Sequence, residues 1–185
     1  MKVLHPRGLG MVCAAAAIAT GLTVAGCADR IQGTAAPNAT DLASYKTEAA
    51  ASSAAATSSR KAAEQSAAIA ANCAQFPTTS GVGVKAYNDF VDAHDSNAPD
   101  YAAKRETAAT TLDDAAAKVE AGVNSAAGAL PPDLAAKFGE YVAAARQLAG
   151  ETRAMSYTAP VGALNDASRR VNDARNAVRD ACPTR

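Results

Sequence analysis

Histidine is scarce in this chain of 185 residues, which has only two, and the usual catalytic motifs are missing. The sequence has no Cys-x-x-Cys pair, no Gly-x-Ser-x-Gly nucleophile motif, no phosphate-binding loop and no dinucleotide fingerprint. It also lacks the Glu-x-x-His pairs that a di-iron helical bundle requires. We therefore expect no catalytic residues, no metal site and no cofactor, and we expect that the protein is not an enzyme.

An excess of basic charge is missing as well. Lysine and arginine together number 18, and aspartate and glutamate also number 18. Nucleic-acid binding usually needs a basic patch, so we expect no nucleic-acid partner. The sequence also has no run of alternating β-branched residues, so we expect no strands.

The first 26 residues have the layout of a secretory signal peptide. Lys2 and Arg7 give a basic start, and Gly8 to Val24 is then apolar or small without a single charge. A run of about 17 residues is at the lower limit of what can cross a hydrocarbon core. A retained transmembrane helix is the alternative interpretation of this segment.

The end of the apolar run is the sequence Val-Ala-Gly-Cys, from Val24 to Cys27. It resembles the lipobox of bacterial lipoproteins, in which an aliphatic residue and two small residues precede a cysteine. The resemblance implies cleavage between Gly26 and Cys27 and attachment of a diacylglycerol to the Cys27 thiol. It also implies a location on the extracytoplasmic face of the cell membrane, without a spanning helix. Two or three acyl chains would hold the protein there, whereas one chain gives only reversible attachment.

The remaining cysteines predict a disulfide. Cys13 leaves with the signal peptide and Cys27 carries the lipid, so Cys73 and Cys182 remain as a pair. Outside the cytosol such a pair tends to be oxidised. The alternative, a metal-binding or redox pair, lacks a Cys-x-x-Cys motif and has a single histidine, His94, in the mature chain.

Composition divides the mature chain in two. Residues 27–72 are rich in alanine, serine and threonine and poor in large apolar residues, so we expect a flexible stalk or a marginal helix. Residues 73–185 carry apolar side chains at three- and four-residue spacing. Prolines and glycines interrupt this pattern and predict a turn over residues 76–83. The predicted fold is therefore all-α, an up-down antiparallel bundle of about four helices that follow that turn, closed by the disulfide.

Two polar groups stand out in the predicted helices. Asp92, His94 and Asp95 include residue types that bind metals, but on a helix His94 points away from both acids. We therefore expect His94 to cover one end of the apolar stripe. The second group is the arginines after Lys137, for which two interpretations remain: ion pairs within helices, or a face that binds carboxylate or phosphate groups.

Taken together, the lipobox, the alanine-rich stalk and the cysteine pair resemble the small alanine-rich envelope lipoproteins of actinobacteria, including mycobacteria. The resemblance implies a non-enzymatic, membrane-anchored protein that binds an envelope protein or polymer. The alternative function is a lipid or small-ligand carrier, which requires a cavity of about 300 Å³ or more between the helices. Four aromatic residues would line that cavity: Tyr87, Phe90, Phe138 and Tyr141.

Overall fold

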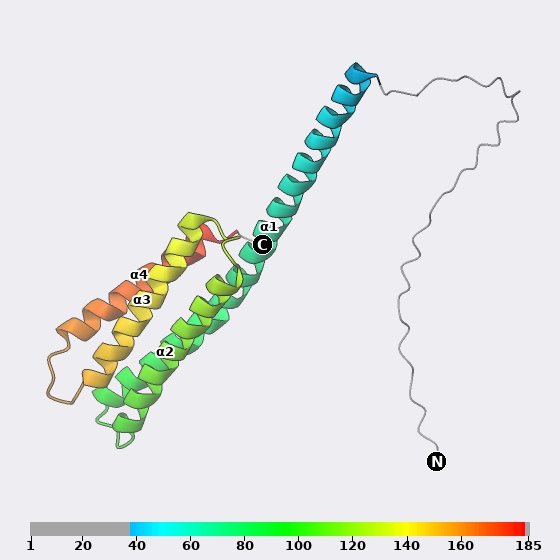
Figure 1. The fold of residues 1–185 in the computed structure, drawn as a ribbon. Helices are drawn as coiled ribbons and strands as arrows, with labels where there is room; N and C mark the ends of the chain where they lie inside the picture. Colours follow the sequence, from blue (N-terminus) through cyan, green and yellow to red (C-terminus); the bar gives the residue numbers. More distant parts are fainter. Residues whose placement is uncertain (1–37, 184–185) are drawn as a thin grey trace, which may run out of the picture. The chain divides into compact units, whose positions relative to one another are not determined.

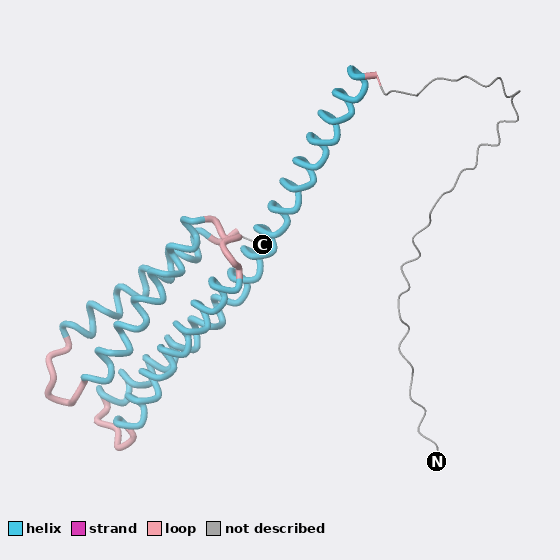
Figure 2. Tube along the Cα trace, viewed as in Figure 1, coloured by secondary structure: helices cyan, strands magenta, loops and turns pink. Residues whose placement is uncertain are grey.

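The computed structural model describes residues 38–183, and all the regular structure in this range is helical (Figure 2). Its helices are α1 (Ala39–Asp95), α2 (Tyr101–Ser125), α3 (Pro132–Ala154) and α4 (Gly162–Ala181). The chain divides into a unit of residues 1–42 and a unit of residues 43–185, and the helical bundle belongs to the second. Short connections join helices that lie side by side (Figure 1). The predicted all-α bundle of four helices is confirmed.

The helices end at residues whose backbone preferences favour a turn. After α1, Asn97 takes a positive φ of 50°, a backbone conformation that asparagine tolerates better than most residues. After α2, Ala127 and Gly128 take φ values of 47° and 80°. Pro131 and Pro132 then begin α3, where a missing backbone N–H costs little.

The apolar stripes predicted for the last three helices form the core. The predicted stripe of α3 is buried throughout, and so is that of α4 except for Ala181. The first stripe consists of Leu134, Phe138, Tyr141, Ala145, Leu148, Thr152 and Met155, and the second of Leu164, Ala167, Val171, Ala174, Val178 and Ala181. The largest apolar side chains with almost no exposed surface come from all four helices. They are Phe90, Leu112, Phe138, Tyr141, Leu148, Val171 and Val178.

The predicted turn over residues 76–83 is wrong, because α1 continues through Pro77 and both glycines. Proline removes one helical hydrogen bond and its ring crowds the preceding turn, which normally breaks a helix. Here the buried face of α1 continues across the proline, since Phe76, Ser80 and Gly83 are all buried. Phe76 packs edge-on against Tyr141, with ring centroids 4.9 Å apart. Tertiary packing therefore outweighs the local preference.

The N-terminal half of α1 differs from the rest of the bundle. The residues expected to form a stalk or a marginal helix are helical from Ala39 onward. From residue 43 to residue 67 every side chain is exposed, including Tyr45. Alanine is the best helix former, so this segment can be helical without burying a face.

Candidate functional site

His94, the strongest candidate for chemistry in the sequence, lies at the C-terminal end of α1. Its Nδ1 atom is 3.1 Å from an oxygen of Asp95, the next residue of the same helix. Asp89 binds Lys85 instead, with 2.7 Å between the carboxylate and the ammonium, and this contact lowers the pKa of Asp89. No group of three or more metal-ligating side chains occurs among the residues that the structure describes.

The ring of His94 belongs to an aromatic cluster at this end of the bundle. Tyr101 and Tyr157 stack with ring centroids 4.2 Å apart, and His94 stacks on Tyr157 at 5.7 Å. The Tyr157 hydroxyl donates a hydrogen bond to the carbonyl of Ala98, at 3.1 Å. The imidazole thus covers the end of the core, in the position that the sequence predicts.

Arg105 fixes the same end from α2. Its guanidinium donates to the carbonyl of Met155 at 2.8 Å, and so attaches α2 to the connection after α3. Burial raises the pKa of Tyr101, which keeps its hydroxyl neutral. The Nε2 atom of His94 and the hydroxyl of Tyr101 are buried without a hydrogen-bond partner among residues 38–183. Ring stacking and two long-range hydrogen bonds hold this end of the bundle together, so the role of the cluster is structural.

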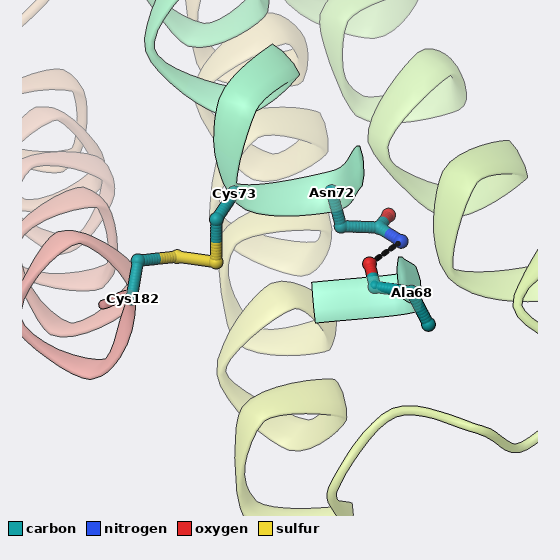
Figure 3. The surroundings of a disulfide bond; sticks show 4 residues. All are labelled: Ala68, Asn72, Cys73 and Cys182. Atoms are coloured by element: carbon teal, nitrogen blue, oxygen red, sulfur yellow. Dashed lines mark hydrogen bonds between the residues drawn. A yellow bond between two sulfur atoms is a disulfide. The ribbon is translucent and has the colours of Figure 1, made fainter. Parts of the chain in front are cut away.

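The opposite end of the bundle carries the disulfide. Cys73 of α1 and Cys182, just after α4, are bonded with their Cα atoms 5.7 Å apart (Figure 3). Beside Cys73, the Asn72 amide donates to the carbonyl of Ala68 at 3.0 Å. The bond links positions 109 residues apart and joins the middle of α1 to the end of α4.

A groove with a volume of about 600 Å³ lies next to the disulfide. One wall is a face of α1 and the other is the end of α4. Of the described residues that line it, only Arg179 is charged. The lining residues are Ser66, Ile69, Ala70, Cys73, Ala74, Phe76, Pro77, Arg179, Cys182 and Pro183.

The interior cavity that a carrier would need is not formed by the four predicted aromatic residues. The cavity beside Tyr87 has a volume of about 30 Å³, and the one beside Phe138 about 10 Å³. Phe90 and Tyr141 are each 1% exposed and pack within the core. The centre of the bundle is filled with side chains.

The arginines form contacts that the sequence did not reveal. Arg146 of α3 binds Glu120 of α2 through both guanidinium nitrogens, at 3.1 and 2.6 Å. One heptad further along α3, Arg153 lies 2.7 Å from Asp113. These ion pairs join neighbouring helices, which neither of the two interpretations of the sequence included. Arg169 does pair within α4, with Asp166.

The predicted cleavage and lipidation sites, Gly26 and Cys27, lie outside the described residues. Within residues 38–183, none of the helices is sufficiently long and apolar to span a bilayer. 

An up-down arrangement of four helices, closed at one end by a disulfide, defines this chain as a four-helix bundle protein. The family model described as the Rv2240c four-helix bundle domain matches residues 55–183, and the chain belongs to this family. The family takes its name from a mycobacterial protein, which is consistent with the actinobacterial resemblance of the sequence. Neither a curated protein nor a solved structure gives a significant match.

Proposed function

We propose that this protein is a membrane-anchored lipoprotein of the cell envelope, and that its bundle is a non-enzymatic binding module for an envelope protein or polymer. The sequence Val24 to Cys27 after an uncharged apolar run carries the proposal. A thiol at this position accepts a diacylglycerol, and the two chains anchor the protein to the extracytoplasmic face of the membrane.

The N-terminal half of α1 fits the role of a spacer. Its 25 exposed residues from 43 to 67 would span roughly 37 Å at the helical rise of 1.5 Å per residue. An exposed helix of small and polar residues holds its two ends apart better than a flexible coil of the same length. This would place the bundle away from the lipid headgroups, where it can reach a partner.

The disulfide supports an extracytoplasmic location. Cysteines of cytosolic proteins are usually kept reduced, whereas disulfides persist in oxidising compartments. The bond between Cys73 and Cys182 stabilises a core whose helix contacts are largely made by alanine. Such a core gains less from apolar burial than one made of leucine.

The charged and aromatic side chains of the bundle contact one another, which supports a binding role over a catalytic one. The Arg146–Glu120 and Arg153–Asp113 pairs join helices, and the His94 ring stacks on tyrosine. These groups are engaged in holding the bundle together. Catalysis would instead require an acid or base whose partners orient it toward a substrate.

The anchor is tested by the intact mass of the protein extracted from membranes. We expect a mass that corresponds to a chain beginning at Cys27 with two or three acyl chains. Cys27→Ser should abolish the adduct and move the protein to the soluble fraction. Cys13→Ser, a matched change within the signal peptide, should leave both unchanged. An unacylated wild-type protein in the membrane fraction would disprove the anchor.

The binding role is tested with the bundle immobilised through its N-terminal helix. One envelope component should bind saturably to the native bundle, and unfolding the bundle should abolish binding. An absence of saturable binding from cleared envelope extract would contradict the proposal that the bundle is a binding module.

A further inference from the structure

We propose that the groove beside the Cys73–Cys182 disulfide binds a long-chain carboxylate, with its acyl tail along α1 and its headgroup at Arg179. This site is separate from the lipid anchor and from the filled interior of the bundle. It assigns the protein a small-ligand site on its surface.

The α1 wall of the groove suits an apolar tail. Ile69, Cys73 and Phe76 follow one another at four- and three-residue spacing, and Pro77 continues the same face. Ala70 and Ala74 leave space between these larger side chains. Phe76 is already buried in the core, so a tail lying here would mainly remove the apolar surface of Ile69, Ala70, Ala74 and Pro77 from water, which favours binding.

The dimensions favour a small ligand over a protein partner. The α1 wall from Ser66 to Pro77 is about 17 Å long at 1.5 Å per residue. A stable protein interface covers about 800 Å² on each partner, far more than a few turns of one helix provide. The volume of about 600 Å³ lies within the range of small-molecule sites, about 300–1,000 Å³.

Arg179 determines the charge of the ligand. Among residues 38–183 it is the only charged residue that lines the groove, and no carboxylate of this range lies within ion-pair distance of it. Its one side-chain hydrogen bond, to Asn176, is long at 3.5 Å. A guanidinium has the planar geometry that binds both oxygens of a carboxylate. The groove thus combines an apolar wall with one cation at its edge, the complement of an acyl carboxylate.

The disulfide makes the site preformed. It joins Cys73 of the α1 wall to Cys182 at the end of α4, with the two Cα atoms 5.7 Å apart, and both cysteines line the groove. A ligand therefore does not have to order these two walls when it binds.

The test measures binding of radiolabelled palmitate to the full chain by equilibrium dialysis. The chain carries Cys27→Ser, so that acyl groups attached to the protein do not contribute, and the result does not depend on whether the proposed anchor is correct. We expect saturable binding of one palmitate per chain. Ala74→Trp introduces a large side chain at an exposed lining position and should abolish saturable binding. Ala70→Trp is a second blocking variant if Ala74→Trp loses helical circular dichroism.

The charge is tested with Arg179→Gln, which should weaken palmitate binding about fivefold through loss of a charged hydrogen bond. Arg169→Gln is the matched control, because Arg169 lies on the same helix, pairs with Asp166 and does not line the groove. Hexadecanol, which has the same tail without the carboxylate, should bind more weakly than palmitate to the parent chain. The proposal is overturned by an absence of saturable palmitate binding, by blocking variants that bind as the parent does, or by equal binding of hexadecanol and palmitate.

Discussion

Gly83 of α1 lies close against Leu112 of α2, which leaves little room for a side chain. A Cβ atom on Gly83 would be 3.3 Å from Cδ2 of Leu112 and 3.6 Å from the Cβ atom of Ala115. The absence of a side chain therefore allows the two helices to approach closely. Gly83 therefore contributes to helix packing, although the sequence analysis places it in a predicted turn.

Gly83→Val should lower the free energy of unfolding by about 1–3 kcal/mol, because the added carbons overpack the contact with Leu112. Urea unfolding followed by circular dichroism measures the change. Gly81→Val is the matched control, since a Cβ atom there has nothing within 4 Å. It should be neutral or slightly stabilising, because valine has a higher helix propensity than glycine. Equal effects at the two positions would contradict a close α1–α2 contact at Gly83.

The last three helices could be predicted from the sequence because two independent signals agree there. In α3, for example, the stripe from Leu134 to Met155 repeats at three and four residues, and Pro132 begins the helix where proline is favourable. The segment from Phe76 to Gly83 gives conflicting signals. Its proline and glycines indicate a turn, and the buried contacts that keep it helical are made with residues far away in sequence.

The ion pairs between helices and the groove could be identified only from the three-dimensional structure, for different reasons. Glu106, Asp113 and Glu120 recur every seven residues in α2, and Arg146 and Arg153 do so in α3. This signal is present in the sequence, but pairing the two sets requires the register of the antiparallel helices. The groove depends on where α4 ends beside the longer α1, which no local pattern specifies.

Replacing both Cys73 and Cys182 by serine should lower the free energy of unfolding by about 2–5 kcal/mol, because the unfolded chain regains the freedom of a long loop. Thermal unfolding with and without a reducing agent measures this. The reductant should lower the melting temperature of the wild type and leave the double-serine variant unchanged. A wild type that is insensitive to complete reduction would contradict a stabilising role for the bond.

The Arg146–Glu120 contact predicts a shifted titration. The hydrogen bonds and charge of Arg146 lower the pKa of Glu120 below its ordinary value. Stabilisation by this pair is therefore present above the ordinary pKa of glutamate and is lost as the pH falls through the lowered pKa. Arg146→Gln should raise the pKa of Glu120 in an NMR titration, and added salt should reduce the difference because the pair is exposed. Arg169→Gln should leave that pKa unchanged, and a pKa that does not respond to Arg146→Gln would show that the contact does not persist in solution.

Tyr141 predicts a loss of stability in alkali. Burial raises the pKa of Tyr141 from 10.0 to about 12, since its ring is 1% exposed in the core. Below pH 10 the tyrosine is neutral in both states, whereas at higher pH the unfolded chain ionises first. Folding stability should therefore fall as the pH rises from about 10 toward 12.

Tyr141→Phe should reduce this alkaline loss, measured as the free energy of unfolding in urea at a series of pH values. Some loss should remain, because burial also raises the pKa values of Tyr87 and Tyr101. Tyr45→Phe is the control, since that side chain is 69% exposed and lies outside the core. If Tyr141→Phe and wild type lost stability equally between these pH values, the hydroxyl of Tyr141 would have to be accessible to hydroxide in the folded protein, and the close packing of its ring against Phe76 would be wrong.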